Sequence, residues 1–146
     1  MENSRKQLKI SAIILLCLAL IDFISMVVEL FVRDFEEIVI PDYSPETVML
    51  VVKICFLVIS FLLLLPQIYV GVRGWRVADH PTSATGHIFW AKLLFVLAVL
   101  GLIAPISNII KTGDVGMNVW DMAVIAAKGF ILFDYIKNAK AVARGI

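Results

Sequence analysis

Seven ionisable side chains interrupt segments that are otherwise apolar, and these are the residues whose type and position could support chemistry. They are Asp22, Glu29, Lys53, Lys92, Asp121, Lys128 and Asp134. An ionised side chain inside a membrane-spanning helix is costly, so each one needs a partner or a function. Carboxylates and ammonium groups at such positions can form buried ion pairs, relay protons or bind a charged solute.

Position along each apolar segment sorts the seven residues into three levels, and every level holds both signs of charge. The middle level holds Asp22 and Lys128, the outer level Glu29, Lys53 and Asp121, and the inner level Lys92 and Asp134. Lys128 lies about 15 Å from either surface, counted at 1.5 Å per helical residue, which is farther than a lysine side chain extends. We therefore predict that Asp22 pairs with Lys128 and that Asp134 pairs with Lys92.

The predicted pair of Asp22 and Lys128 has two interpretations. It could be structural and set the register of two helices, or it could line a pathway for a proton, an ion or a substrate. Lys53 and Lys92 need no partner if their side chains extend to the nearby membrane surface. A water-filled cavity at Asp22 would favour transport, whereas a dry, packed pair would favour a structural role.

Four apolar segments must position these side chains. They cover residues 10–32, 48–72, 88–110 and 118–138, each close to the roughly 20 residues that a membrane-spanning helix needs. The composition agrees, because 61% of the residues are hydrophobic and only 17% are charged. We predict an all-α integral membrane protein, with four transmembrane helices in an up-down-up-down antiparallel bundle that forms one membrane domain over residues 1–146. Pro66 and Pro105 are expected to kink their helices.

The basic residues near the helix ends predict the orientation, because cytoplasmic flanks are enriched in Lys and Arg. One side collects eight of them and the other only two, Arg33 and Lys111. The eight are Arg5, Lys6, Lys9, Arg73, Arg76, Lys137, Lys140 and Arg144. We therefore predict a protein of the cell membrane whose N- and C-termini are both cytoplasmic. Aromatic residues on the same side are expected at the interface, namely Tyr69, Trp75, Trp90 and Tyr135.

No catalytic, phosphate-binding or dinucleotide-binding motif occurs in the sequence. His80 and His87 fall in a predicted loop with Asp79 and supply too few ligands for zinc. We expect no cofactor and no metal, and the net charge of +1 argues against a nucleic-acid partner. The expected partners are the lipid bilayer and either another membrane protein or a second copy.

These observations favour a non-enzymatic accessory or interaction component of the membrane. The first alternative is a small transporter that uses Asp22 and Lys128. The second alternative is a subunit of a membrane-embedded enzyme. A transporter and an accessory component would differ in whether a hydrated cavity surrounds Asp22.

Three stretches around the second and third segments are similar to uncharacterised small four-helix membrane proteins of bacteria. The stretches are 71–74 (GVRG), 78–81 (ADHP) and 87–91 (HIFWA). This likeness implies the same four-helix architecture and carries no known activity.

Two weaker likenesses point to transport. Residues 65–69 (LPQIY), followed by Arg73 and Arg76, resemble the helix-end signature of PQ-loop transporters, a family built on three-helix units. Small multidrug exporters also have four helices and an acid near the middle of the first. Asp22 would take the role of that acid, although those exporters use glutamate.

Overall fold

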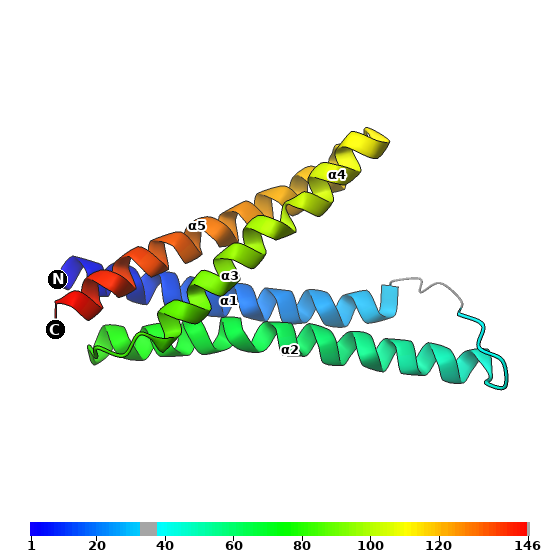
Figure 1. Cartoon of the computed structure of the whole chain (residues 1–146), viewed down its shortest axis with the longest axis horizontal. Coiled ribbons are helices and arrows are strands. Elements are labelled where there is room, and N and C mark those ends of the chain that lie inside the picture. The colour runs from blue at the N-terminus through cyan, green and yellow to red at the C-terminus, as the bar shows by residue number, and fades with distance from the viewer. Residues whose placement is uncertain (33–37, 146) are drawn as a thin grey trace.

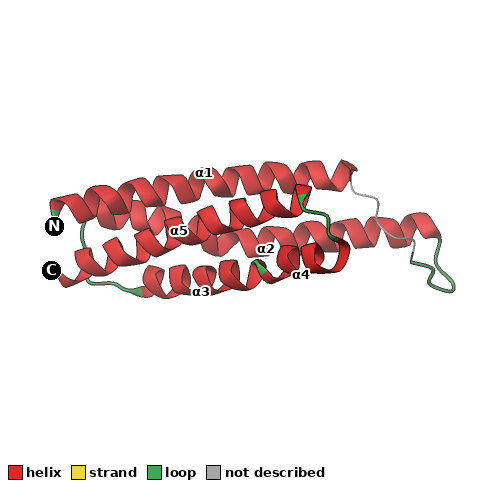
Figure 2. Cartoon of the chain, turned by 90° about the horizontal axis from the view of Figure 1, so that it is seen from above, coloured by secondary structure: helices red, strands yellow, loops and turns green. Residues whose placement is uncertain are grey.

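Every regular element in the described part of the chain is an α-helix in this computed structural model, which describes residues 1–32 and 38–145 (Figure 2). The helices are α1 (Glu2–Val32), α2 (Pro45–Asp79), α3 (Gly86–Gly101), α4 (Ile103–Thr112) and α5 (Gly116–Arg144). The predicted outer-loop residue Arg33 lies outside the described residues. The all-helical class predicted from the sequence is confirmed for the described ranges.

Local sequence signals account for the helix ends. The Ser44 hydroxyl accepts a hydrogen bond from the backbone N–H of Thr47 at 3.3 Å, and Pro45 occupies the first helical turn of α2. At its other end α2 stops at Asp79, close to Pro81, because the residue before a proline disfavours helical geometry. Gly113 ends α4 in the left-handed region, with φ of 70°.

The predicted segment 88–110 is divided at Leu102 into α3 and α4, close to Pro105, where the sequence predicted a kink. Pro105 explains the break: it has no N–H to donate to the carbonyl of Gly101, four residues earlier. Pro66, in contrast, lies inside α2 without interrupting it. The other predicted bounds were too short, because α1, α2 and α5 begin or end several residues beyond 10–32, 48–72 and 118–138.

Among the described residues, three helical stretches are long and apolar enough to cross a membrane. They are α1 with 31 residues, α2 with 35, and Gly86–Thr112 with 27, which joins α3 and α4. α5 is not among them, and it carries Asp121, Lys128 and Asp134 between its apolar residues.

The helices form two pairs that meet at one end of the molecule and diverge toward the other (Figure 1). α1 packs against α2, and α5 packs against α3 and α4. The end at which the pairs meet holds both termini and the connection between α2 and α3, and we call it the terminal end. At the opposite end the turn between α4 and α5 lies far from the start of α2.

The hydrophobic core lies where the two pairs meet. Its buried residues come from all four long helical stretches: Leu8, Ala12, Leu15, Val70, Val77, Ala78, Ile88, Ala91, Leu132, Tyr135, Ala139 and Val142. Gly71 and Gly74 permit the close approach of the helices on α2. A Cβ at Gly71 would lie 2.6 Å from Leu16, and one at Gly74 would overlap the ring of Tyr135. A larger side chain at Gly71 would push α2 away from α1, and one at Gly74 would push the two pairs apart.

Candidate functional site

The predicted contact between Asp22 and Lys128 is present. The Lys128 ammonium donates to Asp22 Oδ2 at 2.6 Å, and this contact joins α1 to α5. The two side chains are 25% and 33% exposed for Lys128 and Asp22, respectively. The pair is therefore partly buried and still has one open side.

That open side faces a pocket of about 350 Å³. Its ten lining residues come from α1, α2 and α5, and six of them are polar or charged. The six are Asp22, Ser25, Glu29, Ser60, Gln67 and Lys128. Small-molecule pockets span roughly 300–1,000 Å³, so this one has room for a small ligand.

Helical spacing gathers these side chains on the pocket wall. On α1, residues 22, 25, 26 and 29 follow the i, i+3, i+4, i+7 pattern, and on α2 residues 60, 63, 64 and 67 repeat it. Lys128 is the one lining residue from α5, and it enters the pocket from the second helix pair. The ion pair therefore links the two helix pairs at the pocket itself.

Gln67 closes the pocket toward the core. It is 5% exposed, and its Nε2 donates to the Leu15 carbonyl of α1 at 3.2 Å. The Leu15 carbonyl lies inside α1, so it accepts this bond in addition to the hydrogen bond from its helical N–H partner. It ties α2 to α1 one residue after Pro66, so the Pro-Gln pair acts here in helix packing.

The prediction that Asp134 pairs with Lys92 is wrong. Asp134 turns toward α1, where the Ser11 hydroxyl donates to its Oδ2 at 2.8 Å. Ser11 and Asp22 are eleven residues apart, which places them within about 20° on one face of α1 at 3.6 residues per turn. That one face of α1 therefore meets both Lys128 and Asp134. The pairing with Lys92 rested on matched depth and on Asp134 pointing to a different side of its helix from Lys128, but both side chains meet α1.

Four of the seven predicted residues remain, and the structure brings one of them, Glu29, to the pocket. Lys53, Lys92 and Asp121 are exposed and lie on α2, α3 and α5. Glu29 is also exposed and lines the pocket with Asp22. Of the seven ionisable residues, three line the pocket: Asp22, Glu29 and Lys128.

A buried polar triad that the sequence did not predict lies near the terminal end. Tyr135 donates to the Val70 carbonyl at 2.9 Å, and its oxygen is 2.7 Å from His87 Nδ1. Tyr135 is 0% exposed and His87 is 1% exposed, so both side chains face the core. The loop position predicted for His87 is wrong, because His87 lies in the first turn of α3. His87 Nε2 is buried without a hydrogen-bond partner. The triad joins α2, α3 and α5, and the paired Gly71 and Gly74 were the only signal of such close packing.

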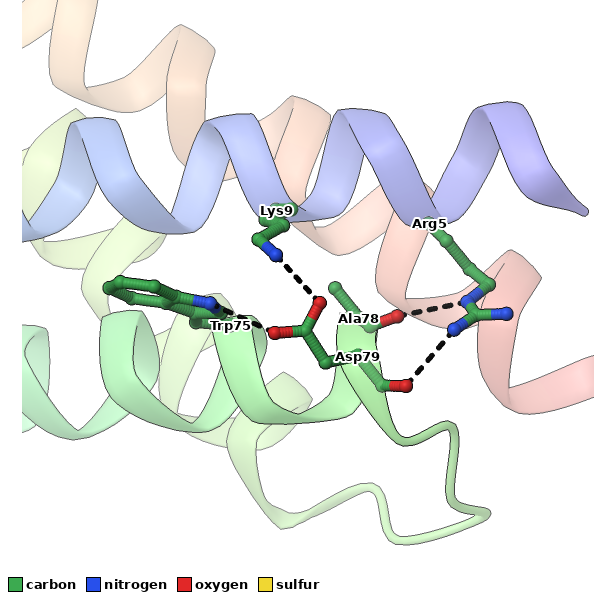
Figure 3. Close-up of polar contacts among 5 residues, drawn as sticks. All are labelled: Arg5, Lys9, Trp75, Ala78 and Asp79. Carbon is green, nitrogen blue, oxygen red and sulfur yellow. Dashed lines mark hydrogen bonds and ion pairs between the residues drawn. The ribbon is translucent and has the colours of Figure 1, made fainter.

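A second polar cluster closes the terminal end between α1 and α2 (Figure 3). Lys9 binds Asp79 Oδ1 at 2.7 Å, while Trp75 donates to Asp79 Oδ2 at 3.0 Å. Arg5 donates to the carbonyls of Ala78 and Asp79, at 2.9 and 3.0 Å, where α2 ends and its last carbonyls lack helical partners.

Neither cluster forms a metal centre: within the described ranges, no three His, Cys, Asp or Glu side chains come together as ligands. Comparisons with protein-family models, with curated proteins and with solved structures found no match.

Proposed function

We propose that this chain is a four-span protein of the cell membrane that binds a small polar solute in the pocket at Asp22 and Lys128 and passes it across the bilayer. The observation that carries the proposal is the pocket of about 350 Å³ around a partly buried ion pair. A dry, packed pair would have favoured the accessory role, and the open polar lining favours a solute site instead.

The four-span topology rests on α5 crossing together with the three apolar stretches. α5 has 29 residues, enough at 1.5 Å per residue for about 43 Å of helix. Its deepest cation, Lys128, is neutralised by Asp22, which removes much of the cost of placing it in hydrocarbon. Both termini lie at the terminal end, as an even number of crossings requires (Figure 1). The bias of basic residues supports a cytoplasmic position for that end.

The ion pair gives the pocket a way to couple binding to helix movement. A cationic group that binds Asp22 must compete with Lys128, and an anionic group that binds Lys128 must compete with Asp22. Either competition weakens the contact that joins the two helix pairs beside the pocket. The pairs already diverge away from the terminal end (Figure 1), so releasing this contact would change the opening between them.

The first experiment asks whether water reaches the pocket in a bilayer. In a background with both native cysteines replaced, Ser60→Cys is expected to react with a membrane-impermeant methanethiosulfonate reagent in proteoliposomes. Leu62→Cys is the control, since Leu62 lies near the same depth on α2 and is outside the pocket. If Ser60→Cys reacted no faster than Leu62→Cys, the pocket would be closed to water and the transport proposal would fail.

The second experiment asks what the pocket binds. Purified protein is screened by thermal unfolding against inorganic cations, inorganic anions and small amino acids, and the solutes that raise Tm are then tested for uptake into proteoliposomes. We expect uptake by the native protein and loss of both the Tm shift and the uptake in Asp22→Asn. A solute that binds without crossing would indicate a receptor or accessory role in place of transport.

The second candidate function is a non-enzymatic accessory component that packs against another membrane protein or a second copy. The observation that favours it is the low coverage of two stretches by the rest of the chain. The most apolar windows of α2 and of Gly86–Thr112 are only 11% and 6% buried. Light scattering in detergent would reveal stable self-association, and a monomer with active uptake would argue against this candidate.

A further inference from the structure

Two arginines of α2, Arg73 and Arg76, line a common groove near the terminal end. In the part of the chain that the structure describes, the side chains of Arg73 and Arg76 make no hydrogen bond or ion pair, whereas Arg5 and Lys9 are both engaged. The nearest acid, Asp79, is held by Lys9 and Trp75 (Figure 3). The N–H donors of both guanidinium groups are therefore available to a ligand outside the chain.

The two arginines line a groove of about 700 Å³ at the terminal end. Its polar lining also includes Asp79 at the end of α2, and His80 and Thr82 from the connection that follows. Arg73 and Arg76 are three residues apart, so they project from neighbouring positions on one helix face. This arrangement presents several N–H donors to one region, which is the geometry that guanidinium groups use to bind phosphate oxygens.

An apolar groove of about 540 Å³ continues from the same two arginines along α2. Its remaining lining residues are Leu65, Ile68, Tyr69 and Val72, which follow one helical stripe into the apolar segment. Tyr69 and Leu65 also line the next pocket along α2, which includes Trp90 of α3. The face therefore runs from a cationic end to a long apolar end.

We propose that this face of α2 binds one anionic phospholipid, with the phosphate on Arg73 and Arg76 and an acyl chain along Leu65, Ile68 and Val72. The charge matches, because the two guanidinium groups are unneutralised and the one acid beside them is already paired. The shape matches as well, because the apolar groove starts where the cationic groove ends. A free phosphate would use only the first of these two grooves.

The test measures lipid binding by native mass spectrometry of delipidated protein in detergent. The probes are dioleoyl phosphatidylglycerol, dioleoyl phosphatidylcholine and glycerol 3-phosphate. We expect one phosphatidylglycerol to bind tighter than either other probe. Arg73→Gln with Arg76→Gln should weaken it about tenfold or more, since each basic residue near a bilayer surface contributes roughly 1 kcal/mol.

Two further variants make the result specific. The double variant Lys137→Gln, Lys140→Gln removes the same charge from exposed positions of α5 at the terminal end. It should weaken the binding of phosphatidylglycerol by less than about threefold. Leu65→Trp should fill the apolar groove and weaken the binding of phosphatidylglycerol, while the binding of glycerol 3-phosphate stays unchanged. Thermal unfolding checks that each variant is folded, and Arg76→Gln alone, at an exposed position, serves if the double change at Arg73 and Arg76 does not fold.

Three results would overturn the proposal. Equal losses in the arginine and lysine variants would mean general surface attraction. Equal binding of phosphatidylglycerol and phosphatidylcholine would remove the role of headgroup charge. Glycerol 3-phosphate binding as tightly as phosphatidylglycerol would indicate a free-phosphate site without an acyl groove.

Discussion

At the residue scale, Asp22 and Lys128 show how matched depth can predict a contact across 106 positions of sequence. In the proposed four-span topology, each would be costly alone in hydrocarbon and each would lie too far from the membrane surface to extend to it. The 2.6 Å contact gives each of the two charges an oppositely charged partner. The pair is nevertheless open to a polar pocket, so its stabilising contribution is smaller than that of a fully buried pair.

A double-mutant cycle on this pair tests the contact. Asp22→Asn leaves Lys128 without its anion, and Lys128→Met leaves Asp22 without its cation, so each single change should destabilise the protein. The double change should lose less than the sum of the two, with a coupling of about 1–2 kcal/mol. Equilibrium unfolding in mixed micelles provides the measurement.

Lys92→Met is the control for that cycle, because Lys92 is an exposed lysine of α3 with no acidic partner among the described residues. It should change the free energy of unfolding by less than about 0.5 kcal/mol. Strictly additive losses at Asp22 and Lys128 would show that the two side chains do not stabilise one another.

The buried hydroxyl of Tyr135 supports a second prediction at this scale. Tyr135→Phe keeps the ring and removes the hydroxyl, which leaves the Val70 carbonyl and His87 Nδ1 without their partner. Leaving buried polar groups unpaired should destabilise the protein by about 1–3 kcal/mol. Thermal unfolding in detergent checks this. Tyr69→Phe, at a 43% exposed tyrosine, should have little effect, and an equal loss in both variants would contradict the argument.

At the element scale, the packing of α2 decides how the helix pairs meet. Gly71 lies against Leu16 of α1, and Gly74 lies against Tyr135 of α5, so one short stretch of α2 contacts both neighbours. α3 and α4 are less constrained, because the break at Leu102 comes from Pro105 within the same stretch. The segments were predictable from apolar length and Pro105 predicted a kink, whereas the position of the break at Leu102 came from the structure.

Two glycine substitutions should have opposite effects. Gly74→Ala places a methyl group into the ring of Tyr135, and overpacking of this kind should destabilise the protein by about 1–3 kcal/mol. Gly129→Ala meets no atom within 4 Å, so the higher helix propensity of alanine should leave stability unchanged or raise it by up to about 1 kcal/mol. Unfolding of both variants under one condition makes the comparison. A stabilising Gly74→Ala would mean that α2 and α5 do not approach closely.

At the scale of the whole molecule, the two helix pairs join tightly at the terminal end and diverge beyond the pocket (Figure 1). The core, the triad at Tyr135 and the cluster at Asp79 all lie toward the terminal end. The pocket at Asp22 lies beyond that core. Movement of the pairs would therefore act on the pocket more than on the packed end.

Reporter fusions test the topology of the whole chain. We expect fusions at the N-terminus, at the C-terminus and at Ser83 to report the cytoplasm, and one at Asp114 to report the other side. The reason is that α5 must return the chain to the terminal end, where eight of ten flanking basic residues are predicted. A C-terminus on the opposite side from the N-terminus would show that α5 does not cross.

The sequence by itself determined the helical class, the apolar length of three of the four predicted spans and the match in position between Asp22 and Lys128. Those properties depend on composition and on distance along a helix, which a sequence contains directly. The tertiary structure alone decided that Asp134 meets Ser11, that Tyr135 and His87 are buried, and that the helix pairs diverge. These outcomes depend on how each helix is rotated. In α1 and α2, large apolar side chains lie on exposed faces as well as on buried ones. No apolar stripe therefore identifies the face that points to the core. Contacts such as those of Gly71 and Gly74 determine which face points inward.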